Sequence, residues 1–250
     1  MKATPSASSL WKRLASQSRA ELAMTARRGE SLLLTIGIPV VLLVFFSSVH
    51  VLPTGTRHPI TFVAPGVMAL AVMSTSMVNL SIATGFERSY GVLKRLHTTP
   101  LGRPVLLAAK AVAVLAVEVI QLAVLSGVSL ALGWNPPGSF LAAAGVVLVG
   151  SAAFAGIGLL LAGTLRAEAN LAASNGLWVV LLLVSGMLVP LSRLPGWMAA
   201  ASRALPAAAL ASALHHALGL GTGVPGSAWV VLGAWAVGAP LAAARWFHWD

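Results

Sequence analysis

Long apolar runs separated by short polar segments dominate the pattern of this chain. A helix needs about 20 apolar residues to cross roughly 30 Å of hydrocarbon at about 1.5 Å per residue. Runs that approach or exceed this length lie at residues 32–49, 61–84, 104–132, 140–165, 170–191 and 229–246. We therefore predict six transmembrane helices. The runs do not alternate in polarity, which argues against a membrane β-barrel.

The segment before the first run has a different pattern. At 5–29, Trp11, Leu14 and Leu22 recur at helical spacing, opposite Lys12 and Arg19. This pattern predicts an amphipathic helix at the membrane interface, and a disordered basic leader is the alternative. Because this segment is long and no small-residue cleavage site closely follows the first run, we interpret that run as a true span and not as a signal peptide.

Two short alanine-rich stretches fill residues 195–218, between the fifth and sixth runs. Pro195 and Pro206 each open one of them, as proline does in the first turn of a helix. Neither stretch is long or apolar enough to span, so we predict re-entrant helices that are buried in protein. His215 and His216 are adjacent and face different sides of a helix, so we expect no metal site.

Composition places the chain in the membrane. Hydrophobic residues make up 58% of it and charged residues only 9%, whereas soluble domains carry about 25% charged residues. Of the sixteen Lys and Arg, thirteen fall on one side of the predicted spans, and Arg57, Arg193 and Arg203 on the other. Positive loops stay in the cytoplasm, so we expect both termini inside. The net charge of +10 then indicates topology and anionic lipid partners, with no nucleic acid.

The second and fourth runs carry residues that favour contact with other helices. Hydroxyl and amide side chains in the second half of span two are expected to bond to neighbouring helices or to line a wetted cavity. Span four has small residues four apart, Ala152 with Gly156 and Gly158 with Ala162, which permit close helix approach. The polar set in span two is Ser74, Thr75, Ser76, Asn79, Ser81 and Thr84.

The loop between spans two and three has a helical pattern of its own. Its apolar residues share one face, basic residues flank that face, and the sequence "TTP" ends the pattern because the residue before proline avoids helical angles. We predict a short cytoplasmic helix at 86–97, which binds either the membrane surface or a groove of a soluble subunit. The apolar face holds Phe86, Tyr90, Leu93 and Leu96, and the basic flanks hold Arg88, Lys94 and Arg95.

The stretch "ERSYGVLKRLHTTPLGR" at 87–103 resembles the ABC-2 type permeases, the membrane half of bacterial ABC exporters, including those similar to the daunorubicin-resistance permease. It has their Glu-Arg pair, a Gly, two Leu, and a Thr-Pro followed by Arg. Ser89 stands where many members carry a second acidic residue, and Val92 where many carry Thr. The frame of an amphipathic helix, six spans and re-entrant helices is similar too, so the resemblance covers nearly the whole chain.

The resemblance implies a single all-α transmembrane domain over residues 1–250, with the ABC-2 exporter fold, in a bacterial cell (inner) membrane. It also implies that 86–97 is a coupling helix seated on an ATP-binding subunit, of which two copies serve the transporter. A second permease would complete a homodimer or a heterodimer. The implied contacts with the ATP-binding subunit are Phe86, Glu87, Arg88, Tyr90, Leu93, Lys94, Arg95 and Leu96, with Glu87 and Arg88 as polar anchors.

The chain shows no site for hydrolysing ATP. None of its lysines follows a glycine-rich phosphate-binding loop, and its few acidic residues are scattered. We therefore expect no catalytic residue and no cofactor in this chain, which is not an enzyme by itself. ATP and Mg²⁺ would bind to the partner subunit.

The resemblance further implies that spans two and five face each other across the dimer and line the substrate path. The candidate lining is apolar with a few hydroxyl and amide groups, so we expect an amphiphilic drug, natural product or lipid-like substrate, moved out of the cytoplasm or the inner leaflet. Flexible Met side chains suit varied apolar surfaces. The predicted path residues are Phe62, Met68, Met73, Met77, Asn79, Asn175, Trp178, Leu182 and Met187.

Glu118 and Gln121 are polar residues midway along the third run, a depth where an ionisable group is costly and usually functional. Three roles are open for Glu118. It bonds to Gln121 or to a neighbouring helix, it contacts the substrate, or it carries a proton. The last role belongs to a rival hypothesis, a proton-coupled secondary transporter. A membrane scaffold without transport is the third hypothesis.

Overall fold

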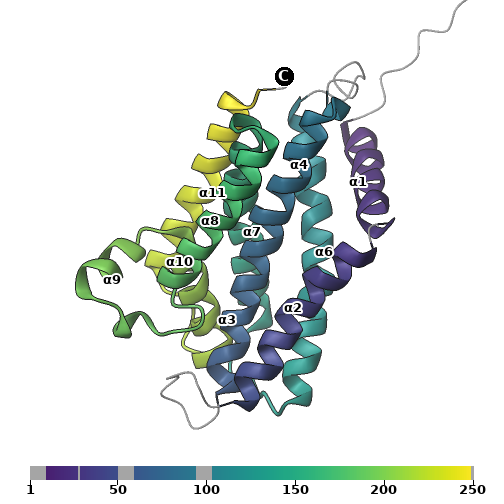
Figure 1. Cartoon of the computed structure of the whole chain (residues 1–250). Coiled ribbons are helices and arrows are strands. Elements are labelled where there is room, and N and C mark those ends of the chain that lie inside the picture. Colours follow the sequence, from purple (N-terminus) through teal and green to yellow (C-terminus); the bar gives the residue numbers. More distant parts are fainter. Residues whose placement is uncertain (1–9, 28, 50–58, 94–102, 249–250) are drawn as a thin grey trace, which may run out of the picture.

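The computed structural model describes residues 10–27, 29–49, 59–93 and 103–248. Within these ranges every regular element is a helix, and the long helices lie side by side in one bundle (Figure 1). Five of the described helices are long and apolar enough to cross a membrane, and a bent pair at the start of the chain makes a sixth if it is counted as one span.

That bent pair consists of α1 (Leu10–Arg27) and α2 (Gly29–Ser48), which meet at an angle of 71°. Helix α1 packs along α6 (Arg103–Ala131), and α2 packs against α6 and against α3 (Ile60–Met73). The buried face of α1 is polar, since it holds Gln17, Ser18 and Glu21, while Trp11 is exposed. Residues 5–9 of the predicted amphipathic helix lie outside the described ranges.

The second span is the central helix of the bundle. It consists of α3 (Ile60–Met73), the π-helical turn η1 (Ser74–Asn79) and α4 (Leu80–Ser89), which form one helix of 30 residues. It runs beyond the expected end at residue 84, so residues 86–89, which we predicted in a separate helix, form its last turn. Gly91 follows with φ of 70°, a left-handed conformation that commonly ends a helix.

Three more long helices complete the bundle. Helix α7 (Phe140–Thr164) packs along α11 (Gly226–Trp246), and α8 (Ala167–Val184) lies beside α4. The side chain of Ser139 caps α7 by accepting a hydrogen bond from the backbone N–H of Ala142 at 3.3 Å. A span was predicted at 170–191; helix α8 begins three residues before residue 170 and ends at Val184, before the predicted end at residue 191.

The segment between α8 and α11 contains η2 (Leu191–Arg193), α9 (Gly196–Ser202), α10 (Pro206–Leu214) and η3 (His215–Leu220). Helix α10 packs against α3, α7 and α11 and is almost completely buried. The backbone N–H of Ser139 donates to Ala217 O at 3.0 Å, and His215 Nε2 lies 3.0 Å from Phe62 O. Helix α9 instead projects from the side of the bundle (Figure 1).

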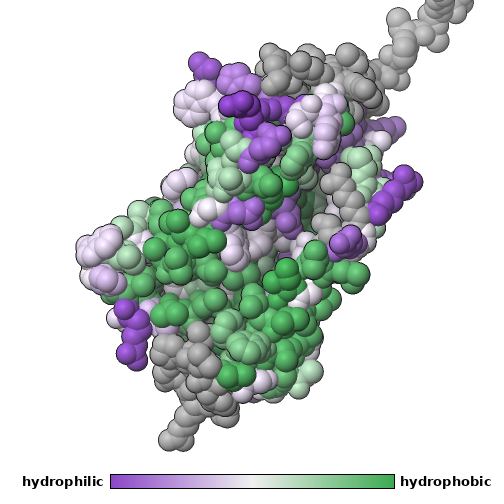
Figure 2. Space-filling model, in the orientation of Figure 1, coloured by the Kyte–Doolittle hydropathy of each residue, from purple (hydrophilic) through white to green (hydrophobic). Residues whose placement is uncertain are grey.

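Apolar side chains form both the interior and much of the outer surface. A buried cluster joins α3, α7, α10 and α11, while Leu33, Leu141, Leu183 and Val230 point outward. Figure 2 shows apolar side chains over the lower part of the visible face and hydrophilic side chains gathered at the upper end, near the ends of α4 and α11. This distribution suits a protein surrounded by lipid over most of its length.

Candidate functional site

The last turn of α4 and the residues directly after it, together 86–93, hold those described residues that were predicted to meet an ATP-binding subunit. Phe86 and Tyr90 stack with ring centroids 6.1 Å apart, and Tyr90 is 72% exposed. Glu87 Oε2 accepts a hydrogen bond from Lys110 Nζ at 2.5 Å, and Arg88 Nη2 donates to Leu165 O at 2.6 Å. Both predicted polar anchors therefore bond within the chain, and Arg88 caps the end of α7.

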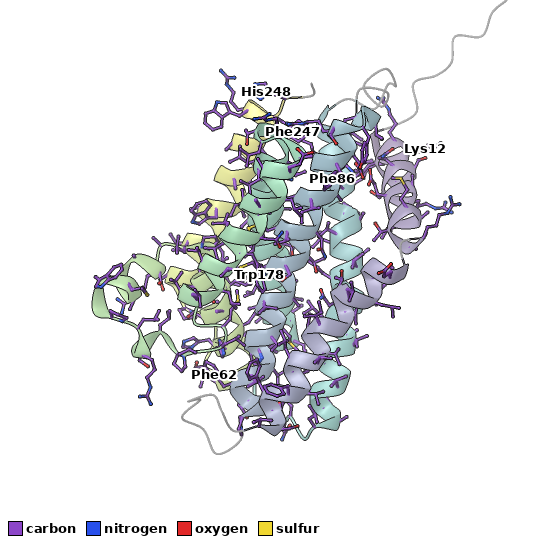
Figure 3. All side chains as sticks on the ribbon, viewed as in Figure 1. Lys12, Phe62, Phe86, Trp178, Phe247 and His248 are labelled. Atoms are coloured by element: carbon purple, nitrogen blue, oxygen red, sulfur yellow. The ribbon has the colours of Figure 1, made fainter. Side chains whose placement is uncertain are left out.

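Leu93 holds this turn against the bundle. It is only 1% exposed and packs against Leu106 and Phe247, which lies at the same end of the molecule as Phe86 (Figure 3). In this chain Leu93 is thus a packing residue, contrary to its predicted place on a free docking face. Lys94, Arg95 and Leu96 lie outside the described ranges.

A groove of about 790 Å³ lies between α2, η1 and α8. It brings together Asn79, Asn175 and Trp178, three of the residues predicted to line a substrate path. Trp178, placed midway along the bundle in Figure 3, donates from Nε1 to Ser74 Oγ at 2.7 Å. The volume lies within the roughly 300–1,000 Å³ typical of ligand pockets.

Helix α2 supplies one wall of this groove. The sequence prediction missed this role, because it assigned the path to spans two and five alone. The Asn79 Nδ2 donates to Thr35 Oγ1 at 3.1 Å, so the polar residue Thr35 in the first apolar run was the available signal. Arg27 and Glu30 lie at one end of the groove, where α1 meets α2. The apolar part of its lining consists of Leu34, Ile38, Pro39, Leu42, Leu70 and Val78.

The other predicted path residues lie elsewhere. Met68, Met73, Met77 and Met187 are at most 3% exposed and belong to the core. Phe62 stacks on His215 with ring centroids 4.4 Å apart, and Leu182 packs at the edge of the core. Met68 and Met73 fill the interior because their helix, α3, is apolar around its whole circumference, as expected of a buried helix.

Glu118 is 0% exposed and accepts hydrogen bonds from Ser76 on η1 and from Ser151 on α7. Gln121, one turn along α6, accepts from Thr75 Oγ1 at 3.0 Å and donates to Thr35 O at 2.7 Å. These bonds connect α2, η1, α6 and α7. Of the three roles open for Glu118, the geometry shows bonding to neighbouring helices, and Glu118 does not line the groove.

Asn170 ties α4 to α8 through hydrogen bonds to Ser81. Its Oδ1 accepts from Ser81 Oγ at 2.6 Å, and its Nδ2 donates to Ser81 O at 2.9 Å. Ser174 Oγ also donates to Ser81 Oγ at 3.0 Å. A side chain at Gly85 would come within 2.5 Å of Asn170 Nδ2, so the two helices approach closely here.

Comparison with known proteins gives one family match. The family model of the ABC-2 type transporter matches residues 15–218, from α1 to η3. No curated protein matches the chain. The match confirms the resemblance and the all-helical membrane fold predicted from the sequence.

Proposed function

Because the chain belongs to the ABC-2 type transporter family, in which it is a membrane permease subunit, we propose that it exports amphiphilic molecules. The membrane domain of this family lacks the ATPase site, and its members work with ATP-binding subunits. In this proposal two ATP-binding subunits hold ATP and Mg²⁺, and a second permease, identical or related, completes the transporter. Candidate substrates are drugs, natural products and lipid-like molecules.

The groove between α2, η1 and α8 is the observation that carries this proposal. Its wall combines apolar side chains with the hydroxyl and amide groups of Ser74 and Asn175. Pockets of this kind bind the apolar part of a ligand by burial and orient it with a few polar groups. Arg27 and Glu30 at one end offer charged partners for a polar head group.

The groove also suits loading from the membrane. Leu34 and Ile38 line it and are more than half exposed, so an amphiphile reaches them from the surrounding lipid. Arg27 and Glu30 lie where α1 meets α2, which is the end of α2 that is nearer to the end of α4 (Figure 1). Entry from the leaflet on that side supports export if that side is the cytoplasm.

We place that end in the cytoplasm of a bacterium, with both chain termini on the same side. Lys110 lies near the start of α6, Arg166 just before α8 and Arg245 near the end of α11, and these helix ends gather at the same end of the bundle as the end of α4 (Figure 1). This placement suits the retention of positive charge on the cytoplasmic side. Of the described basic residues, only Arg193 and Arg203 were assigned from the sequence to the other side of the membrane.

The turn at 86–93 is the proposed docking site of the ATP-binding subunit. Glu87 bonds to α6, Arg88 bonds to the end of α7, and Leu93 packs on Phe247. A force applied at Tyr90 therefore reaches α4 itself, α6, the end of α7 and the segment that follows α11. This arrangement supports a turn that transmits movement and not merely a connecting loop.

The docking proposal is tested by Tyr90→Asp, measured as co-purification of the co-expressed ATP-binding subunit. We expect co-purification to fall at least tenfold, because the variant places a carboxylate where the aromatic ring of Tyr90 would contact the subunit. The fold should not change, since Tyr90 is exposed. Trp197→Asp is the matched control, since Trp197 is 73% exposed on α9, far from the turn (Figure 1). Full co-purification with Tyr90→Asp would show that the subunit docks elsewhere.

A further inference from the structure

Lys110 is a buried cation shared by two other helices. It is 3% exposed, and its Nζ lies 3.1 Å from Glu21 Oε2 on α1 and 2.5 Å from Glu87 Oε2 at the end of α4. We call Glu21, Glu87 and Lys110 the charge cluster. The cluster joins the N-terminal helix, the proposed docking turn and the start of the third span.

Stability alone explains the charge cluster poorly. Taking charges out of water costs several kcal/mol per ion, about as much as the ions regain by pairing, so buried ion pairs are a weak source of stability. A cavity of about 110 Å³ also adjoins the cluster, and its lining combines all three charged residues with apolar side chains. Thr84 lines this cavity too, and its buried Oγ1 has no hydrogen-bond partner among the described residues.

The cavity allows the charges to separate. A space of this size has room for water, which needs only about 10–15 Å³ per molecule on this measure, and the charged and threonine side chains in its lining offer hydrogen-bond partners. Water beside the ammonium and the carboxylates lowers the cost of separating them. Lys110 can thus move between Glu21 and Glu87 without leaving an ion in an apolar environment.

The position of α1 depends on this cluster. Its buried face carries Gln17, Ser18 and Glu21, and Gln17 Nε2 donates to Glu21 Oε1 at 2.9 Å. A polar face of this kind gains little from burial of apolar area, so its bonds to α6 hold it in place. Helix α1 leads into α2, which forms one wall of the groove.

We propose that Lys110 is a mobile ionic link between Glu87 and Glu21, through which a movement of the docking turn also moves the α2 wall of the groove. We call this link the clasp. Glu87 lies one helical turn before Tyr90, so movement of the docked subunit shifts Glu87 directly. Lys110 passes that shift to Glu21, and α1 carries it to α2. The inference rests on the proposed function, because it needs a nucleotide-driven movement at the turn.

The absence of cysteine from the sequence makes the clasp directly testable. Spin labels at Leu33→Cys on α2 and Leu183→Cys on α8, both exposed positions, report the distance across the groove. The distance is measured by electron paramagnetic resonance in the complex with the ATP-binding subunit, with one labelled permease copy per complex. The two states compared are nucleotide-free and trapped with Mg²⁺, ATP and vanadate.

In the otherwise unchanged chain we expect trapping to shift this distance. Glu21→Gln should reduce the shift to less than half, because Lys110 then holds Glu87 alone. A triple variant leaves no unpaired charge in the cluster: Glu21→Gln, Lys110→Met and Glu87→Gln. It should show the same loss of the distance shift, and it replaces the single variant if that variant fails to assemble. Glu168→Gln, at an exposed acidic residue in the first turn of α8, should keep the full shift.

A full shift in either assembled cluster variant would overturn the clasp. So would the absence of any shift in the unchanged chain when the complex hydrolyses ATP. If the unchanged chain neither binds the ATP-binding subunit nor traps nucleotide, the proposed function fails, and the clasp fails with it.

Discussion

At the scale of single residues, the buried polar groups are arranged in pairs and triads. Glu118 lies at a depth where an unpartnered carboxyl group would be costly, and two serine hydroxyls donate to it. Ser76 and Ser151 come from different helices, so the carboxyl group holds those helices together. The role of Glu118 is therefore structural, as an acceptor that joins two helices to α6.

Glu118→Leu should lower the free energy of unfolding by about 2 kcal/mol, because two buried hydroxyls lose their acceptor. Each serine can recover part of this by bonding to a carbonyl of its own helix, which keeps the loss moderate. Glu118→Gln should remain close to the unchanged protein, since its amide oxygen still accepts. The measurement is thermal unfolding in detergent, together with transport.

If Glu118→Gln unfolds normally but transport stops, the charge itself is required, and a proton-carrying or substrate-binding role replaces the structural one. Equal loss of stability in both variants would also contradict the account, because the hydrogen-bond acceptor would then not be the property that matters.

Residue roles were only partly predictable from the sequence. Glu118 and Asn79 stand out as polar residues in apolar runs, and both form interhelical hydrogen bonds. Met73 and Met77 were predicted on the substrate path, but packing places them in the core. From the sequence, Lys110 entered only the count of positive charges. Its ion pair with Glu21 could not be predicted, because that pair depends on how α1 packs against α6.

At the scale of elements, the lengths of the apolar runs predicted where the long helices lie, while turn geometry set their ends. The π-helical turn η1 was not predictable, because its polar residues adopt it with partners on other helices. Ser74 bonds to α8, Thr75 and Ser76 to α6, and Asn79 to α2. Such turns occur often at functional sites, and this one lines the groove.

Close approach of α7 and α11 depends on a glycine that the small-residue pattern had indicated. A side chain at Gly156 would come within 2.5 Å of the Pro240 nitrogen. Gly156→Ala should therefore force the helices apart and cost about 1–3 kcal/mol of stability, as overpacking usually does. Gly233→Ala on α11 is the matched control, because no atom lies within 4 Å of the added carbon.

Thermal unfolding of the two glycine variants in the same detergent makes the comparison. The control should be unchanged or slightly more stable, since alanine favours a helix over glycine by about 1 kcal/mol. An unfolding temperature for Gly156→Ala equal to that of Gly233→Ala would mean that α7 and α11 do not need this contact.

At the scale of the whole molecule, hydropathy and the 87–103 motif predicted the fold class and the family, both of which the family match confirms. Neither of them predicted the groove wall supplied by α2 or the internal bonds of the docking turn. These features arise from contacts between helices far apart in the sequence, such as Lys110 with Glu21 and Arg88 with Leu165. The molecule that results has an open groove in the membrane and a braced turn at one end.

The most direct test of this account is the source of energy for transport. Inside-out vesicles would contain the chain with or without the ATP-binding subunit, and uptake of a panel of fluorescent amphiphiles would be measured with a protonophore present. We predict uptake that requires both ATP and the ATP-binding subunit and is insensitive to the protonophore. Uptake by the chain alone, or uptake that a proton gradient drives without ATP, would contradict the account.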